Sequence, residues 1–149
     1  MSAAPSSLPK EIFKAYDIRG IVGAQLTAAV AERIGQGLGT LALEAGGKAI
    51  AIGRDGRLSG PDLCAGLARG VRAAGADVID IGMVATPMTY FAAHHLGCGS
   101  AVSVTGSHNP PDYNGLKMVV AGTTLAGDAI QDLRERIERG DVGAGAGGY

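Results

Sequence analysis

The sequence predicts an α/β fold: a three-layer α/β/α sandwich around a mixed, mostly parallel sheet of about four strands. Short apolar runs alternate with longer segments in which apolar residues recur every three or four positions, as expected for strands that alternate with amphipathic helices. The turn between the last two strands is too short for a crossover helix, so we expect that pair to be antiparallel. The chain of 149 residues is long enough for one domain with its own core.

Four strands and four helices are expected from these patterns. The strands are predicted at residues 48–53, 77–82, 100–105 and 116–121. The first helix is predicted from its N-cap, Thr27, to about Glu44, and the others at residues 61–75, 86–96 and 125–139. Gly35, Gly37 and Gly39 lie inside the first helix and lack the spacing of a dinucleotide fingerprint, so we interpret them as sites of close helix packing.

The helix boundaries rest on capping patterns. Ser59 and Asp62 have the spacing of a capping box, with Pro61 in the first turn. Thr86 is the expected N-cap of the third helix, and Pro87 its first residue. In the last helix an apolar stripe faces the core, and the charged residues are expected on the solvated face: Asp132, Arg134, Glu135, Arg136 and Glu138.

The two ends of the chain differ in composition from the middle. Residues 1–9 are rich in Ser, Ala and Pro, so we expect a flexible segment. Residues 10–139 are the predicted domain. Residues 140–149 are rich in glycine, which predicts a linker or a frayed end.

Charge and composition exclude several classes of function. The formal net charge of −1 provides no basic surface for nucleic acid or for a membrane. No apolar run approaches the roughly 18 residues of a membrane span, and no secretory segment is evident. Cys64 and Cys98 show no paired spacing, which favours free thiols in a reducing compartment. We therefore expect a cytoplasmic protein.

The segment most informative about function is residues 105–110, Thr-Gly-Ser-His-Asn-Pro. The preceding strand ends at Gly106, and Asn109 is held away from helical conformation by Pro110. Such a loop presents Ser107 at the end of a strand, outside any hydrogen-bonded ladder.

Three interpretations of Ser107 are open on these residues: a polar turn residue, a hydrolase nucleophile or a phosphoryl carrier. The nucleophile elbow needs glycine two residues before and two after the serine, where this chain has Thr105 and Asn109. His108 is adjacent to Ser107, so the two side chains should diverge. Donors for a phosphoryl group are available nearby in sequence from His108, Asn109 and Lys117.

The serine loop, followed by Tyr-Asn-Gly-Leu-Lys-Met at residues 113–118, resembles the phosphoserine loop of the α-D-phosphohexomutase superfamily, and within it the bacterial phosphomannomutases/phosphoglucomutases. Residues 13–20, 53–60 and 80–87 agree with that family in order and spacing. The resemblance covers residues 8 to about 139 and identifies the chain as similar to the N-terminal domain (domain 1) of these enzymes.

The resemblance implies that Ser107 carries the phosphoryl group and that Lys117 is the general acid/base, with His108 as a polar partner. Tyr16 and Arg19 would face the substrate cleft, with Asn109 as a further phosphate donor. Without the resemblance, a surface ion pair with Asp17 is an equally good interpretation of Arg19. The charged loop at residues 54–57 would shape the cleft, and contact with the substrate is the second interpretation of it.

The resemblance also implies a reaction and its partners. The family moves phosphate between the 1 and 6 positions of mannose or glucose through a bisphosphate such as glucose 1,6-bisphosphate. Its Mg²⁺ is bound by the phosphorylated serine, here Ser107, and by an Asp-x-Asp-x-Asp stretch that this chain lacks. Three further domains carry the sugar and distal phosphate sites, so we expect this fragment to be inactive alone. The alternative is a non-catalytic module that binds sugar phosphates.

Overall fold

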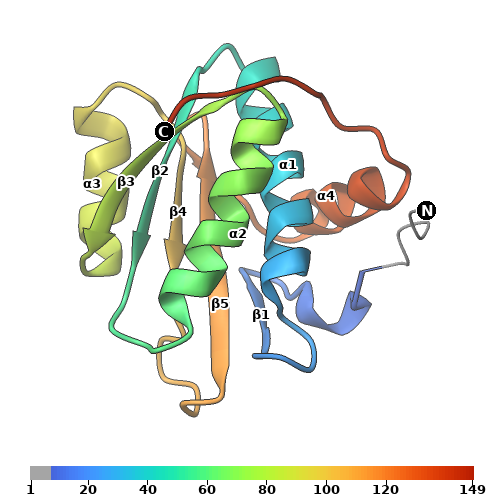
Figure 1. Cartoon of the computed structure of the whole chain (residues 1–149), viewed down its shortest axis with the longest axis vertical. Helices are drawn as coiled ribbons and strands as arrows, with labels where there is room; N and C mark the ends of the chain where they lie inside the picture. The colour runs from blue at the N-terminus through green and yellow to red at the C-terminus, as the bar shows by residue number, and fades with distance from the viewer. Residues whose placement is uncertain (1–7) are drawn as a thin grey trace.

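A computed structural model of the chain describes residues 8–149 and confirms the predicted fold class (Figure 1). The strands are β1 (Ile18–Ile21), β2 (Ala49–Arg54), β3 (Asp77–Met83), β4 (Ala101–Val104), β5 (Tyr113–Val120) and β6 (Thr123–Thr124). The helices are α1 (Ala28–Glu44), α2 (Gly60–Ala73), α3 (Thr86–His95) and α4 (Asp128–Glu138), with a 3₁₀ turn, η1, at Lys10–Ile12.

The sheet is mixed, as expected, but larger than the predicted four strands. Its order is β1-β5-β4-β2-β3, and β6 extends β5. β2 pairs in parallel with β3 and β4, whereas β5 is antiparallel to β4, β1 and β6. Because β1 and β6 add antiparallel pairs, the parallel pairings do not predominate among the described residues.

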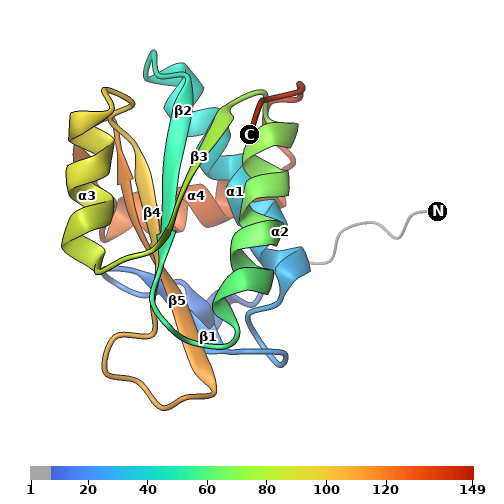
Figure 2. The same ribbon diagram turned by 60° about the vertical axis from the view of Figure 1, so that its left-hand side comes forward.

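The two faces of the sheet are covered unequally (Figure 2). α1, α2 and α4 pack on one face, where the main core contains the apolar side chains of β2, β4 and β5. On the other face α3 lies over β2 and β4, and the buried side chains there are small: Ala51, Ala93 and Ala101. Side chains alternate along a strand, so residues next to core-facing ones on β1 and β5 lie on the α3 side.

Glycines bring α1 and α2 together, as the sequence predicted. A Cβ at Gly35 would lie 2.2 Å from the carbonyl oxygen of Leu67, and a Cβ at Gly70 would lie 1.8 Å from that of Glu32. These distances are shorter than any real Cβ contact, so the two helix backbones are in direct contact. Gly37 on the other side of α1 makes room for Leu133 and Ile137 of α4.

Two of the predicted capping hydrogen bonds are absent, although Ser59 is the N-cap residue of α2. Thr27 caps α1 as expected, because its Oγ1 accepts a hydrogen bond from the amide of Val30 at 3.1 Å. Ser59 makes no capping bond at α2; its Oγ instead accepts from Nδ2 of Asn114 at 2.8 Å. The N-cap of α3 is Ala85, and the hydroxyl of Thr86 accepts a hydrogen bond from Ser103. Hydrogen bonds to residues distant in sequence therefore replace both expected capping bonds.

One residue of α4 also differs from the expected pattern. Its stripe of Ile130, Leu133 and Ile137 is buried as predicted. Arg134, expected on the solvated face, is 9% exposed and donates a hydrogen bond to Glu138 at 2.6 Å. The ion pair one turn along the helix satisfies the guanidinium, which allows its burial.

The chain ends make specific contacts. Residues 1–7 of the expected flexible segment lie outside the described residues, whereas Leu8 is buried and its amide donates to Glu138. The glycine-rich segment 140–149, expected as a linker or frayed end, follows the ends of α2 and β3 and makes backbone hydrogen bonds there. These hydrogen bonds hold residues 140–149 against the domain, so the segment is not frayed in the structure. Along residues 8–149, no helix combines the length and apolar character of a membrane crossing.

Candidate functional site

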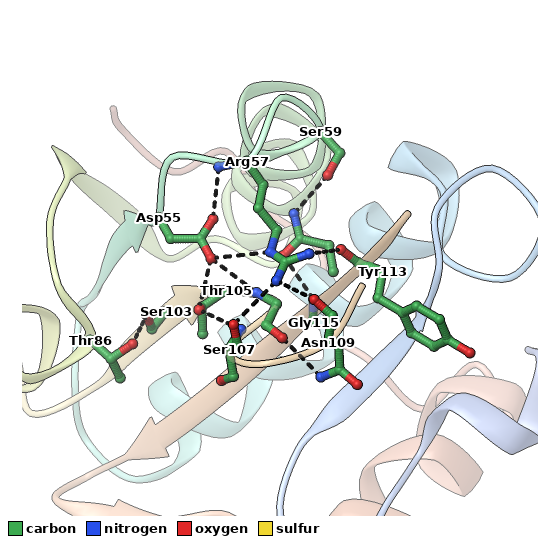
Figure 3. A network of polar contacts seen from close by, with 12 residues as sticks. Asp55, Arg57, Ser59, Thr86, Ser103, Thr105, Ser107, Asn109, Tyr113 and Gly115 are labelled. Atoms are coloured by element: carbon green, nitrogen blue, oxygen red, sulfur yellow. Dashed lines mark hydrogen bonds and ion pairs between the residues drawn. The ribbon is translucent and has the colours of Figure 1, made fainter. Parts of the chain in front are cut away.

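The serine loop joins β4 to β5 at the carboxyl end of β4 (Figure 3). Ser107 is exposed and has a φ of 52°, in the left-handed region that non-glycine residues rarely adopt. Its amide donates to Oγ1 of Thr105 at 3.1 Å. The amide nitrogen Nδ2 of Asn109 donates to the carbonyl oxygen of Gly106 at 2.8 Å. The loop is therefore closed by its own short-range hydrogen bonds.

Asp55, in the loop after β2, fixes the start of the serine loop from outside. Its carboxylate accepts hydrogen bonds from the hydroxyl of Thr105 at 2.9 Å and from the amide of Gly106 at 3.0 Å. Burial alone would raise the pKa of Asp55. Hydrogen bonds from the amide of Arg57, from Thr105 and from Gly106, together with the Arg57 charge, hold that pKa below its usual value.

Arg57 binds the rest of the loop. Its Nη1 donates to the carbonyl oxygens of Pro110 at 2.6 Å and Tyr113 at 3.0 Å. Its Nη2 donates to those of Ser107 at 3.2 Å and Asn109 at 2.7 Å. The Nε lies 3.5 Å from the carboxylate of Asp55. One guanidinium thus gathers four main-chain carbonyl groups.

Gly106 is required where the guanidinium meets the loop. A Cβ at this position would lie 2.1 Å from both Cζ and Nε of Arg57. Any other residue would push the guanidinium away from the four carbonyl groups. The glycine that ends the strand therefore also makes room for Arg57.

The remaining predicted site residues lie on β1, on β5 and on the loop itself. Lys117 is opposite Ser103 in the β4–β5 register, and Ser103 contacts α3, so both side chains lie on the α3 side of the sheet. Arg19 neighbours β5 on the same side, and its side chain is 39% exposed, with Nε 3.7 Å from Asp17. Tyr16 is 78% exposed. His108 is exposed beside Ser107, on the same loop.

These placements separate two groups of predicted residues. Arg19 and Lys117 share one side of the sheet with few partners, as expected of groups available to a ligand. Asn109, predicted as a phosphate donor, uses its Nδ2 inside the loop. Asp55 and Arg57 were predicted to shape the cleft, with substrate contact as the second possibility; their hydrogen bonds hold the serine loop. Their partners are about 50 residues away in sequence, so no local pattern could have revealed them.

The described residues do not form a magnesium site by themselves. Mg²⁺ prefers six oxygen ligands in an octahedron, usually carboxylates, phosphates and water. Ser107 offers a single hydroxyl oxygen, and the nearby carboxylate of Asp55 already accepts hydrogen bonds from the loop. Within residues 8–149, no three His, Cys, Asp or Glu side chains gather as metal ligands would. His94 and His95 are exposed, and His95 stacks on Phe91.

The α/β/α architecture, with a glycine-containing serine loop at the end of a central strand, defines a class of domain that is found among known protein families. The family model for phosphoglucomutase/phosphomannomutase, alpha/beta/alpha domain I, matches residues 10–143, and the chain belongs to this family.

Individual relatives agree with that assignment. The chain is 54% identical to a phosphomannomutase/phosphoglucomutase of Pseudomonas aeruginosa over 98% of its length and 32% of the relative's. It is 56% identical to a phosphoglucomutase of Neisseria meningitidis, over 90% of the chain and 29% of that protein. A crystal structure of a family protein from Burkholderia thailandensis superposes with a TM-score of 0.90 at 51% identity, covering 95% of this chain and 33% of that one. The chain thus spans about a third of the length of its relatives.

Proposed function

We propose that this chain is the phosphoserine-bearing domain of a phosphohexose mutase, with Ser107 as the phosphoryl carrier. The observation that carries the proposal is the serine loop itself. Ser107 is exposed, lies in a conformation that its neighbours enforce, and is not hydrogen-bonded to a histidine anywhere in residues 8–149. These features suit a hydroxyl that holds a group and presents it to a substrate.

The transfer step uses residues on the adjacent side of the sheet. A sugar hydroxyl attacks the phosphorus, the bond from phosphorus to Oγ of Ser107 breaks, and a new bond to the sugar oxygen forms. Lys117 accepts the proton of the attacking hydroxyl and donates a proton to the leaving Oγ of Ser107, and the same transfers run in reverse when the serine is phosphorylated again. Arg19 and Tyr16 contact the sugar phosphate, and His108 orients the phosphoserine. The planar fork of Arg19 suits a phosphate oxygen pair.

The whole reaction needs more than this domain. Hexose 1-phosphate and hexose 6-phosphate of mannose or glucose interconvert through a bisphosphate, and glucose 1,6-bisphosphate loads the serine. Phosphorylated Ser107 and carboxylates from outside this chain would hold Mg²⁺, which would supply positive charge to offset that of the phosphate. The chain spans about a third of the length of its relatives, and in this proposal three further domains of the whole enzyme would supply those carboxylates and the sugar site. The isolated chain is therefore expected to show no mutase turnover.

A second function is a non-catalytic module that binds sugar phosphates. It would use the same loop and the same Arg19, but Ser107 would never accept a phosphoryl group. The partly exposed Arg19 and Lys117 side chains are compatible with both functions, so phosphorylation of Ser107 is the discriminating property.

Mass spectrometry of the intact chain tests the proposal. The chain is incubated with glucose 1,6-bisphosphate and Mg²⁺, next to a Ser107→Ala variant. A gain of one phosphoryl group that the variant lacks is the expected result. The measurement is repeated with the remaining domains restored. If Ser107 gains no phosphoryl group in either form, the carrier role is refuted and the binding module is the better account.

A further inference from the structure

The donors of Arg57 are completely used. A guanidinium has five N–H groups in a fixed plane and no acceptor. Four of them point to the carbonyl oxygens of Ser107, Asn109, Pro110 and Tyr113. The fifth, on Nε, faces the carboxylate of Asp55 at 3.5 Å. None is left for a phosphate.

Arg19 is a useful contrast in the same region of the molecule. It makes one ion pair, at 3.7 Å to Asp17, and 39% of its side chain is exposed. The side chain of Arg57 is 17% exposed. Arg19 therefore has donors available for an anion, whereas the donors of Arg57 are bound to the protein backbone.

We propose that Arg57 is a positioning residue for phosphoryl transfer, which holds the serine loop in its reactive shape and does not touch the substrate. The proposal rests on the function proposed above for Ser107. Four carbonyl groups that converge within one tight loop repel one another, and they would also repel an anionic phosphoryl group. The guanidinium turns all four toward itself and neutralises their negative ends.

The same contacts account for the backbone of Ser107. A residue with positive φ costs about 1–2 kcal/mol and persists only where its surroundings determine it. Arg57 holds the carbonyl of Ser107, while Asp55 and Thr105 hold the amides of Gly106 and Ser107. Asp55 also faces the Nε of Arg57, so the pair fixes both ends of the turn.

Lysine cannot replace Arg57 in this role. An ammonium group concentrates three donors at one point, whereas the four carbonyl oxygens are bound from two separate nitrogens of a rigid plane. Arg57→Lys therefore retains the positive charge but cannot hold the serine loop in its shape. Arg69→Lys is a matched control, because Arg69 is exposed and its side chain forms an ion pair with Glu32 far from the serine loop.

The test combines amide hydrogen exchange with the kinetics of phosphoryl uptake from glucose 1,6-bisphosphate. In Arg57→Lys we expect faster exchange of the Gly106, Ser107 and Asn109 amides, with β2 and β4 unchanged. We also expect the maximal rate of uptake to fall about tenfold or more, because misplacement of a reacting group by about 1 Å costs up to about a hundredfold. The half-saturating concentration of bisphosphate should stay within about twofold of wild type, because the substitution removes no contact with the bisphosphate. Arg69→Lys should change neither quantity.

Each other outcome contradicts the proposal. A higher half-saturating concentration at an unchanged maximal rate would make Arg57 a phosphate ligand. Faster exchange throughout the sheet would make it a residue of general stability, and unchanged exchange in the loop would remove its positioning role. If wild type takes up no phosphoryl group even with the remaining domains restored, the carrier function of Ser107 fails separately, and the exchange of the loop amides alone decides the role of Arg57.

Discussion

The contact between α1 and α2 leads to a prediction whose sign opposes helix propensity. Gly70→Ala would place a Cβ 1.8 Å from the carbonyl oxygen of Glu32 and 2.7 Å from the amide nitrogen of Gln36. Both atoms belong to the backbone of α1, so no side chain can rotate away. Ordinary contact begins near 3.4 Å, and the helices would have to separate by the difference, about 1.6 Å, at this point.

The expected effect follows from two opposing terms. Overpacking of a tight core costs about 1–3 kcal/mol, and a rigid backbone partner places this site at the upper end. Alanine in place of glycine contributes about 1 kcal/mol of helix propensity in return. The net loss of unfolding free energy is about 2 kcal/mol, or a fall in Tm of about 4–8 °C for a domain of this size.

Chemical denaturation and calorimetry of the purified chain measure this loss. Ala65→Gly is the control, because Ala65 is exposed on the same helix and loses only propensity, about 1 kcal/mol. Both substitutions should destabilise, although they exchange the same two residues in opposite directions. If Gly70→Ala is as stable as wild type or more stable, the close approach of the two helices is refuted.

Three further predictions concern the loops and a thiol. The free energy of unfolding of Ser107→Gly should exceed that of Ser107→Ala by about 1 kcal/mol, and that of Ala121→Gly should exceed the wild-type value by a similar amount, because both positions have positive φ. Urea denaturation measures both differences, and equal stability would contradict the backbone strain. The lowered pKa of Asp55 means that its stabilising contribution is present above the unfolded value of about 3.9 and is lost as pH falls through the folded value; an acid titration of stability should therefore be shallower for Asp55→Asn, and identical slopes would contradict it. Burial raises the pKa of the Cys64 thiol to about 12, so iodoacetamide at pH 8.5 should label Cys64 at least about a hundredfold more slowly in the native chain than in urea; comparable rates would show an accessible thiolate.

Periodicity made the helices and the longer strands predictable. α1 was expected at nearly its observed bounds, because its apolar stripe, its cap at Thr27 and its terminal glycines all agree. β1 was missed because it has four residues and includes Arg19 and Gly20. It becomes a strand only by pairing with β5, and the same pairing starts β5 at Tyr113, before the apolar run that predicted it. Such non-local pairings leave little trace in local sequence.

The residues of the candidate site could be predicted from the sequence, but the hydrogen bonds that hold the serine loop could not. The serine loop is a local motif, so Ser107, His108 and Lys117 could be singled out from sequence. The hydrogen bonds of Arg57 join residues more than 50 positions apart. Asn109 was expected to donate to a phosphate, and the fold adds a second role, because one N–H of its Nδ2 closes the loop. Side-chain partners depend on which loops lie at the same end of the sheet.

The glycine-rich end of the chain has a consequence for association between molecules. β3 is an edge strand, and a free edge can recruit a strand from another chain. Here the amide of Val78 donates to the carbonyl of Gly148, and the Tyr149 hydroxyl donates to Asp80. A Cβ at Gly147 would lie 1.8 Å from the carbonyl oxygen of Ala76, so only glycine lets the backbone approach this closely. Residues 140–149, whose composition is typical of a spacer, thus cover part of the sheet edge and keep it from pairing with a strand of another molecule.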